Sequence, residues 1–321
     1  MDIKDKKIIY HLDRDSLQSL TKLAKKIGVR KEVVRYRLQN LIKSGAVRNT
    51  YIAIDITKLG YTYYKIYIKL HKVDSIKEEE LIAFICKNDH VTWAASLEGS
   101  FDLAFTVVAK SVNEFDEIWK SINRKYGEFF RNHEIMIFTS SHEFSLDFFL
   151  DKQPNLGYDS LLFGGGHSTY KLSDKEKLVI ELMNKSPRIS VSSISKSSGI
   201  PPSAVRYIIK KLRREGIIKK FSILIDSSCM DDTYYKVRVP IKLRNFTDQD
   251  EKELFKHVKS HPFFTIYSSC IGKWDVELNV WTKNNKHYRE IMRDLINNFS
   301  NIIEDYETLF VSKQYKCKYM T

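Results

Sequence analysis

The chain has 321 residues, of which 43% are hydrophobic and 12% aromatic, and its formal net charge is +13. This length and composition suffice for two or three domains with packed cores and exclude a disordered chain. No apolar run reaches about 18 residues and the N-terminus opens on charged residues, so neither export nor a membrane partner is expected. The positive charge favours an anionic partner, most often a nucleic acid.

The four cysteines lie far apart in the chain: Cys86, Cys229, Cys270 and Cys317. Without a Cys-x-x-Cys spacing they predict neither a metal site nor a redox motif, and reduced thiols indicate a cytoplasmic location. His257 and His261 are four residues apart, as two ligands on one helical face would be, but no third ligand accompanies them. We therefore expect no metal and no cofactor.

Residues 1–56 predict a winged helix-turn-helix domain. Apolar residues recur at helical spacing over residues 3–13, 16–27 and 30–44, and Gly28 and Gly45 end the last two segments. Only Gly28 and Val29 separate these two helices, which is the arrangement of a helix-turn-helix. From Ala46 to Ile56 apolar and polar residues alternate, which predicts a short strand pair or wing.

Residues 57–150 predict an αβ domain. Strands are expected at residues 64–70, 91–97, 101–109 and 134–144, and helices at 77–87 and 112–126. The order β-α-β-β-α-β is that of a ferredoxin-like domain, an antiparallel sheet with both helices on one face. Residues 151–170 contain Pro154, Gly157 and the run Gly164–Gly166, which predicts a flexible linker.

The second half of the chain repeats the first half. Val34-Arg35-Tyr36 recurs as Val205-Arg206-Tyr207, and Asp55 as Asp226, each 171 residues later. A period this long indicates a duplicated module and not a solenoid, whose periods are roughly 20 to 50 residues. We expect a second helix-turn-helix over residues 171–227 and a second αβ domain over 228–321. The predicted fold class is α+β: two copies of a winged helix-turn-helix domain followed by a ferredoxin-like αβ (βαββαβ) domain.

Basic and polar residues concentrate on the third predicted helix of each copy, which lies in the major groove in a DNA-bound helix-turn-helix. In the first copy the residues expected to contact DNA are Arg30, Lys31, Arg35, Tyr36, Arg37, Gln39 and Arg48. In the second copy they are Arg206, Tyr207, Lys210, Lys211 and Arg214. Arg binds guanine and Gln binds adenine in bidentate fashion, whereas Lys mostly attracts phosphates. For any single residue the alternative is a solvated helix face in a lysine-rich protein.

Several segments follow one another in the order of a known family: Asp5–Ile9, Leu23–Val29, Val34–Leu41, Gly45–Val47, Ile52–Asp55 and Leu59–Tyr61. They resemble the helix-turn-helix, the hinge strand and the entry to the αβ domain of the Lrp/AsnC family of bacterial and archaeal transcription regulators. The resemblance implies double-stranded DNA as partner, assembly into dimers or larger homo-oligomers, and small molecules, often amino acids, bound between αβ domains. Most members carry one unit per chain, so this tandem form resembles a covalent pseudo-dimer whose two sheets could pair within one molecule.

The second copy departs from the family at the start of its third predicted helix, which reads Pro201-Pro202, but Pro is well tolerated in a first turn, so we expect the helix to survive. Ile208 replaces Arg37 in the second copy, which predicts a weaker or differently specific second reader. Two turns resemble the family's Gly-x-aromatic-Asp segment and imply these effector-binding residues: Gly99, Ser100, Asp102, Gly272, Trp274 and Asp275. The alternative for these residues is a hairpin turn with a structural aspartate.

We predict a cytoplasmic, sequence-specific DNA-binding transcription regulator modulated by a small molecule such as an amino acid, with no catalytic residues and therefore not an enzyme. One alternative is a siroheme decarboxylase-like enzyme of haem biosynthesis, because such enzymes resemble Lrp-like regulators and also occur as paired or fused units. The predicted wing strands at residues 48–55 and 219–226 contain no His, which argues against the enzyme. The other alternative is a non-specific chromatin-type DNA binder, which would show a steep salt dependence without sequence preference.

Overall fold

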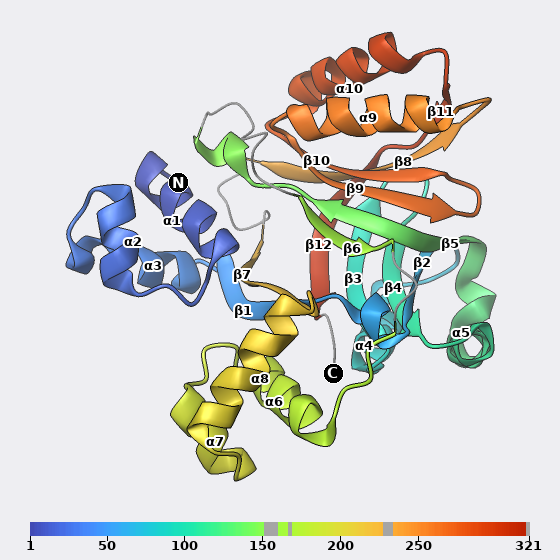
Figure 1. Cartoon of the computed structure of the whole chain (residues 1–321). Helices are drawn as coiled ribbons and strands as arrows, with labels where there is room; N and C mark the ends of the chain where they lie inside the picture. Colours follow the sequence, from blue (N-terminus) through green and yellow to red (C-terminus); the bar gives the residue numbers. More distant parts are fainter. Residues whose placement is uncertain (151–159, 166–168, 227–233, 319–321) are drawn as a thin grey trace. The chain divides into compact units, whose positions relative to one another are not determined.

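The computed structural model describes residues 1–150, 160–165, 169–226 and 234–318 of the chain, which divides into two compact units (Figure 1). The head unit comprises residues 1–60, 166–229 and 318–321, and the barrel unit comprises residues 61–165 and 230–317. Each half of the chain therefore contributes to both units. Across the described ranges, no helix has the length and apolar character needed to cross a bilayer.

The first helix-turn-helix of the head unit consists of α1 (Ile3–Arg14), α2 (Leu20–Ile27) and α3 (Lys31–Lys43). Asp2 and Asp5 form a capping box at the start of α1, and the Ser19 side chain accepts a hydrogen bond from the Lys22 amide at the start of α2. Gly28 ends α2 with a φ of 77°, a left-handed conformation that glycine adopts without steric cost. Local capping rules therefore account for where these helices begin and end.

The second helix-turn-helix repeats this plan with α6 (Asp174–Lys185), α7 (Val191–Ser198) and α8 (Pro202–Arg214). Ser173 and Glu176 form its capping box, Ser190 caps α7, and Gly199 ends α7 with a φ of 70°. Pro202 lies in the first turn of α8, where the missing N–H removes no helical hydrogen bond. The helix predicted to survive its two prolines is present.

One strand from each copy joins the two helix-turn-helix domains. β1 (Val47–Ile54) and β7 (Ile218–Ile225) form an antiparallel two-stranded ribbon. At its ends the Asp226 amide donates to the Ala46 carbonyl at 3.1 Å, and the Asp55 amide donates to the Ile217 carbonyl at 2.8 Å. These bonds occupy equivalent positions of the repeat. The sequence predicted a short strand pair or wing over residues 46–56, but each copy contributes a single strand, which pairs with its counterpart in the other copy.

The first αβ domain contributes β2 (Thr62–Leu70), α4 (Ser75–Lys87), β3 (Val91–Glu98), β4 (Leu103–Ala109), α5 (Val112–Tyr126) and β5 (Phe130–Glu143). The second contributes β8 (Tyr235–Leu243), α9 (Asp248–Ser260), β9 (Phe264–Ile271), β10 (Val276–Thr282), α10 (Asn285–Phe299), β11 (Ile303–Tyr306) and β12 (Leu309–Cys317). Within the first copy the strands lie in the order β5-β2-β4-β3, which is consistent with the predicted ferredoxin-like domain. In the second copy β11 and β12 share the place of the last strand, and both pair with β8.

Hydrogen bonds between the copies close these strands into a barrel. β5 pairs with β9, and β12 pairs with β3, in both cases antiparallel. The pairings therefore run through β8, β10, β9, β5, β2, β4, β3 and β12 and return to β8. The outer strands β5, β3, β9 and β12 thus each find a partner in the other copy, so none of these four strands is left as an open edge of a single-copy sheet.

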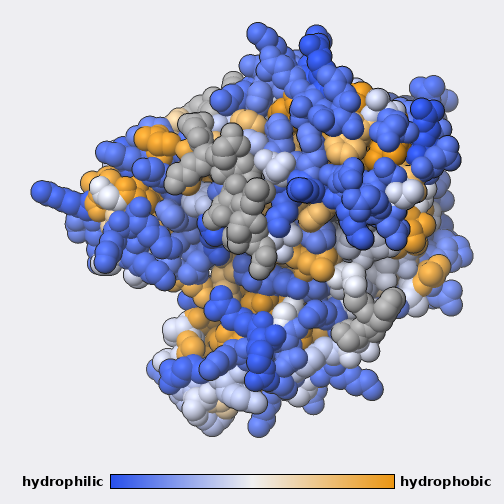
Figure 2. All heavy atoms as spheres, turned by 45° about the horizontal axis from the view of Figure 1, so that its top comes forward, coloured by the Kyte–Doolittle hydropathy of each residue, from blue (hydrophilic) through white to orange (hydrophobic). Residues whose placement is uncertain are grey.

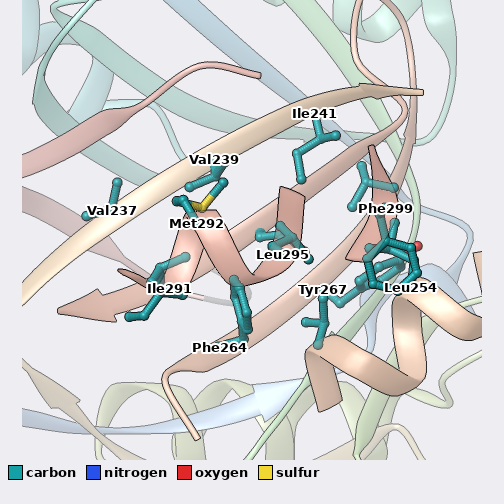
Figure 3. Packing of buried hydrophobic residues seen from close by; sticks show 14 of the residues in the cluster. Val237, Val239, Ile241, Leu254, Phe264, Tyr267, Ile291, Met292, Leu295 and Phe299 are labelled. Atoms are coloured by element: carbon teal, nitrogen blue, oxygen red, sulfur yellow. The ribbon is translucent and has the colours of Figure 1, made fainter. Parts of the chain in front are cut away.

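The barrel strands have two buried faces. Tyr64, Ile66 and Ile68 of β2 pack in the core beneath α4 and α5. The equivalent core of the second copy lies beneath α9 and α10, where Leu254 and Leu295 face the strands (Figure 3). The residues that alternate with these, such as Lys65 and Tyr67, point into the barrel, where Tyr67 packs with residues of both copies. Outside, most of the face shown in Figure 2 is hydrophilic.

The predicted linker contains a strand that the sequence analysis missed. Residues 151–159 and 166–168 lie outside the described residues, but β6 (Leu161–Gly164) pairs with residues 140–143 of β5. Gly164 has a φ of 80°, and a Cβ there would lie 2.6 Å from the Thr139 carbonyl oxygen. The prediction of flexible coil was therefore wrong for residues 161–164. The strand can approach β5 closely because residue 164 is a glycine and has no Cβ.

Candidate nucleic-acid interface

The polar face of α3 is open to solvent. Arg30, Lys31, Arg35, Tyr36 and Gln39 are exposed, and Tyr36 has an exposed fraction of 66% despite its aromatic ring. The opposite face is buried through Val34, Leu38 and Leu41, whose spacing of three to four residues is that of one helical stripe. Among the residues that the structure describes, these five polar side chains have no hydrogen-bond or ion-pair partner.

The polar face of α8 has the same centre. Arg206 and Tyr207 lie at the positions of Arg35 and Tyr36, and the exposed fraction of Tyr207 is 62%. Lys210 is exposed as well. Arg214 pairs with its neighbour Glu215 at 3.2 Å, but 69% of the Arg214 side chain remains exposed. An exposed Arg-Tyr pair is therefore common to both third helices.

Arg37 does not lie on this exposed face. Its guanidinium contacts the carboxylates of Asp2 at 2.7 Å and Asp5 at 3.0 Å, the two residues of the capping box of α1. The hydrogen bond to Asp5 raises the pKa of Arg37 above its ordinary value. Arg37 thus braces α3 against the start of α1, and its expected DNA contact stays a prediction with a competing structural role.

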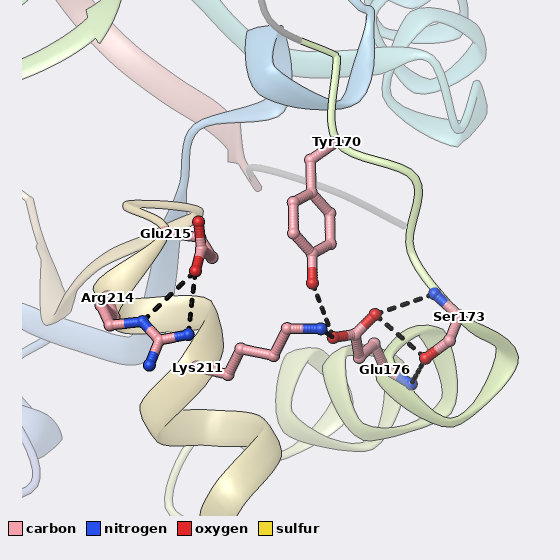
Figure 4. A network of polar contacts seen from close by, with 6 residues as sticks. All are labelled: Tyr170, Ser173, Glu176, Lys211, Arg214 and Glu215. Atoms are coloured by element: carbon pink, nitrogen blue, oxygen red, sulfur yellow. Dashed lines mark hydrogen bonds and ion pairs between the residues drawn. The ribbon is translucent and has the colours of Figure 1, made fainter.

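Lys211 has the corresponding role in the second copy (Figure 4). Its ammonium lies 2.9 Å from Glu176, the capping-box residue of α6, and the Tyr170 hydroxyl donates to the same oxygen at 2.8 Å. Burial of Glu176 opposes its ionisation, but hydrogen bonds from the Ser173 amide, Lys211 and Tyr170 prevail and lower the pKa of Glu176 to about 2. Lys211 thus replaces the brace that is lost when Ile208 stands in place of Arg37.

Arg48 belongs to the ribbon between the two copies. Its guanidinium pairs with the buried carboxylate of Asp226 on the other copy. At the equivalent position Lys219 lies 3.4 Å from Asp55, whose side chain is 1% exposed. These two cross-copy ion pairs were missed by the sequence analysis, although an Arg or Lys and an Asp recur at the same positions of both copies.

Basic residues on the second helix differ between the copies. α2 carries Lys22 and Lys25 on its exposed side, and Lys26 donates to the Gln18 side chain at 3.0 Å. In α7 Lys196 stands among serines, so this helix offers less positive charge. The first helix-turn-helix therefore has more basic residues to meet a phosphate backbone before its third helix begins.

The residues predicted to bind an effector lie in the turns after β3 and β9, where internal contacts occupy them. Asp102 accepts hydrogen bonds from the Leu70 amide at 2.8 Å and from Lys69 at 2.7 Å. Asp275 repeats this arrangement with the Leu243 amide at 2.8 Å and Lys242 at 3.1 Å. Both aspartates thus tie a hairpin turn to the neighbouring strand.

The other residues of these turns also contact the rest of the barrel. A Cβ on Gly99 would lie 2.6 Å from the Thr308 carbonyl oxygen, and one on Gly272 would lie 2.9 Å from that of Ile135. Ser100 donates to Glu307, and the buried indole of Trp274 donates to Glu134 at 2.9 Å. Effector binding by these six residues stays a prediction. The observed contacts are those expected of the alternative, a hairpin turn with a structural aspartate.

The two histidines at metal-ligand spacing lie at the end of α9. His257 is 3.0 Å from Asp294, and His261 is the residue that caps the helix. In the ranges that the structure describes, no three His, Cys, Asp or Glu side chains are placed to hold a metal ion.

Comparisons with known proteins identify the class of both helix-turn-helix domains. Residues 1–42 match the AsnC-type helix-turn-helix domain, and residues 172–219 match a winged helix-turn-helix DNA-binding domain. The protein is thus of the helix-turn-helix DNA-binding class. It is 30% identical over 133 residues to the HTH-type transcriptional regulator LrpA of Pyrococcus horikoshii, a match that covers 37% of this chain and 92% of the relative. The chain belongs to the Lrp/AsnC family of transcriptional regulators, at about twice the size of a single regulator.

Two further likenesses bear on the tandem form. The HTH-type transcriptional regulator FL11 of Pyrococcus furiosus is 26% identical over 145 residues, which cover 45% of this chain and 92% of the relative. The crystal structure of the siroheme decarboxylase NirDL covers 98% of this chain and 93% of its own, with a TM-score of 0.62 and 13% identity. At that identity the second likeness concerns the fold alone.

Proposed function

We propose that the protein is a sequence-specific transcription regulator that reads DNA with α3 and α8. The observation that carries this proposal is an exposed arginine and tyrosine at equivalent positions of both helices: Arg35 and Tyr36, Arg206 and Tyr207. In each copy another basic residue of the same helix, Arg37 or Lys211, contacts the capping box of the first helix. The Arg-Tyr pair therefore remains available to contact DNA. Arginine suits guanine recognition, and tyrosine hydroxyls contact phosphates.

The two readers have different tasks in this proposal. Residues at the start of a recognition helix contact base edges, and α3 begins with Arg30 and Lys31 where α8 has Pro201 and Pro202. The charges of α8 instead gather toward its C-terminal end, where Lys210 is exposed just before the last turn. We therefore assign base reading mainly to α3, with Gln39 as a further base contact, and a phosphate grip or a neighbouring half-site to α8.

The tandem chain acts as a covalent pseudo-dimer in this proposal, and further assembly into a homo-oligomer is compatible with the family. The antiparallel ribbon and its two equivalent ion pairs support an approximate twofold relation between the two helix-turn-helix domains. Two readers so related would bind half-sites about 34 Å, or a multiple of that distance, apart. A small-molecule effector such as an amino acid, and a cytoplasmic location, complete the proposal.

The match to NirDL over nearly the whole chain favours a second candidate, a siroheme decarboxylase. The two ribbon strands at residues 48–55 and 219–226 contain no His, which weighs against this candidate. It is tested by incubating the protein with siroheme and following the loss of carboxyl groups by mass spectrometry. Decarboxylation together with a failure to select DNA would replace the regulator by the enzyme.

The regulator is tested by selecting bound fragments from genomic DNA at physiological salt. The intact protein should enrich a spaced, imperfectly symmetric motif, and an Arg35→Ala, Arg206→Ala double variant should lose it. The control is an Arg124→Ala, Arg131→Ala double variant, which removes the same charge from exposed positions of the barrel unit. Enrichment without a motif would indicate a non-specific chromatin-type binder instead.

A further inference from the structure

The inside of the barrel contains a buried polar cluster built from both copies, which we call the interior cluster. It consists of Lys65 and Tyr67 on β2, Trp93 on β3, Arg238 on β8, and Glu277 and Asn279 on β10. Strand pairing brings Asn279 opposite Arg238, and Lys65 and Trp93 both lie opposite Thr106. The proposed DNA readers do not use these residues.

Lys65 is a buried basic group without an acidic partner. It is 2% exposed, and its ammonium lies 3.4 Å from the ring centroid of Trp93 and 5.5 Å from that of Tyr67. In the described part of the chain it has aromatic rings but no carboxylate or hydrogen-bond acceptor as partner. Burial therefore lowers the pKa of Lys65 to about 7, with Glu277 opposing the shift and Arg238 adding to it.

The nearby carboxylate is already in use. Arg238 donates to one oxygen of Glu277 at 3.2 Å, and the Tyr67 hydroxyl donates to the other. The Arg238 guanidinium also lies 4.9 Å from the Trp93 ring centroid, so both cations contact the same indole. The cluster thus contains two basic groups and one acid, and among the described contacts Glu277 makes no hydrogen bond or ion pair with Lys65.

Two further polar atoms of the cluster lack partners. Neither Nε of Arg238 nor Oδ1 of Asn279 has a hydrogen-bond partner among the described residues, and Asn279 is 6% exposed. A buried polar atom without a partner costs about 1–3 kcal/mol, and an uncompensated buried charge costs more. Lys65 and Nε of Arg238 therefore both lack an acceptor, whereas Oδ1 of Asn279 is itself an acceptor and would need a donor.

We propose that the interior cluster is a binding site for a small carboxylate. A single carboxylate would balance the second cation, and its two oxygens match the planar guanidinium of Arg238 and the ammonium of Lys65. The apolar side chains around Tyr67, among them Leu97, Met136 and Leu309, would contact a short apolar body. The Arg238 side chain keeps 14% of its surface exposed, so the cluster is not sealed from solvent on that side.

The second copy provides an internal control. Lys236 is the repeat equivalent of Lys65, and it lies 4.8 Å from the ring centroid of Trp281. Lys236 is only half-buried and has a further interaction of its own. The two lysines that lie on indole rings therefore differ in burial, and only Lys65 belongs to the interior cluster.

The site is tested on the full-length protein by isothermal titration and thermal unfolding with acetate, pyruvate and L-leucine, using chloride at equal ionic strength as reference. We expect at least one carboxylate to bind and to raise the Tm. Lys65→Met should weaken binding at least tenfold while raising the Tm of the ligand-free protein, because a buried basic group without an acidic partner is removed. Lys236→Met should bind as the parent does.

A second variant separates a ligand site from a packing role. Asn279→Asp adds a carboxylate opposite Arg238, so it should stabilise the ligand-free protein and abolish carboxylate binding. The proposal is overturned if no carboxylate binds the folded parent, if chloride stabilises it equally, or if Lys65→Met binds undiminished. Binding itself is independent of the DNA readers, whereas a role as effector site rests on the proposed function. A DNA selection without a motif would therefore refute regulation and leave the binding result intact.

Discussion

At the scale of single residues, two arginines in α3 have different roles because they lie on different sides of the helix. Arg35 and Arg37 are two positions apart, which rotates the side chain by about 200° around the axis. Arg35 is exposed and has no partner in the described ranges, whereas Arg37 contacts Asp2 and Asp5. Residue type and proximity in the sequence are therefore a weak guide to which basic residue meets DNA.

Arg37→Ala should lower the free energy of unfolding by about 1–2 kcal/mol, because it removes charge-assisted hydrogen bonds to the α1 capping box. Arg35→Ala should change it by less than about 0.5 kcal/mol and instead weaken DNA binding. Urea unfolding followed by circular dichroism measures the first effect, and fluorescence anisotropy of a labelled operator measures the second. An Arg37→Ala variant of unchanged stability that no longer binds DNA would make Arg37 a DNA contact.

Glu176 predicts a pH dependence of stability. Its pKa is about 2 in the folded state and about 4.5 ordinarily, so the folded state binds the proton more weakly than the unfolded state. The stabilisation is complete above pH 4.5 and is lost as the pH falls from 4.5 toward 2. The difference in unfolding free energy between the parent and Glu176→Gln should shrink over this window. Glu181→Gln removes a carboxylate from an exposed position of the same helix and serves as the control variant.

At the scale of elements, the β1–β7 ribbon shows how the repeat is used. Each copy supplies one strand and one half of each cross-copy ion pair, so neither copy completes the ribbon alone. The carboxylates of Asp55 and Asp226 are buried, and burial reduces the screening of the ion pairs by water and salt.

A double-mutant cycle on Arg48 and Asp226 should give a coupling energy on the order of 1–2 kcal/mol. The cycle uses Arg48→Ala, Asp226→Ala and the double variant, with urea unfolding as the measurement. Arg214 and Glu215 serve as the control pair, since this exposed contact should give less than about 0.5 kcal/mol. Equal coupling energies in both cycles would show that the Arg48–Asp226 ion pair does not stabilise the contact between the two helix-turn-helix domains.

In the molecule as a whole, the duplication permits the two helix-turn-helix domains to diverge in sequence while they remain in one chain. Arg35 and Arg206 are equivalent, but Gln39 is replaced by Lys210 and Lys43 by Arg214. A dimer of identical chains cannot specialise its readers in this way. The same freedom made the interior cluster, where Tyr67 of one copy and its equivalent, Arg238, of the other bind the same carboxylate, that of Glu277.

This divergence predicts two kinds of DNA-binding defect. Lys210→Ala with Arg214→Ala should reduce the salt slope of binding by about two and weaken all sequences alike, because both residues are assigned to phosphates. Arg35→Ala should relax the sequence preference of one half-site by about 1–3 kcal/mol per contacted base. Anisotropy titrations at several salt concentrations, on the selected operator and a scrambled duplex, separate these effects. Loss of sequence preference in the Lys210, Arg214 variant would reverse the assignment.

Much of the fold could be predicted because its signals are local. The capping residues Asp2, Ser19 and Ser173 and the glycines that end α2 and α7 act within one helical turn. The family resemblance, which depends on the order of such signals, is confirmed by the comparisons. β6 was missed, since four residues with glycine at one end have too little periodicity to distinguish a strand from coil.

The helices, most of the strands, their order and the duplication follow from the sequence alone, because each of them is recognised from a pattern along the chain. The closed barrel, the partners of Arg37, Arg48 and Lys211, and the burial of Lys65 without an acidic partner appear only in the tertiary fold. The physical reason is that ion pairing and desolvation depend on distance in space and on burial. Arg48 and Asp226, for example, are in contact although a whole αβ domain and most of a helix-turn-helix domain separate them along the chain.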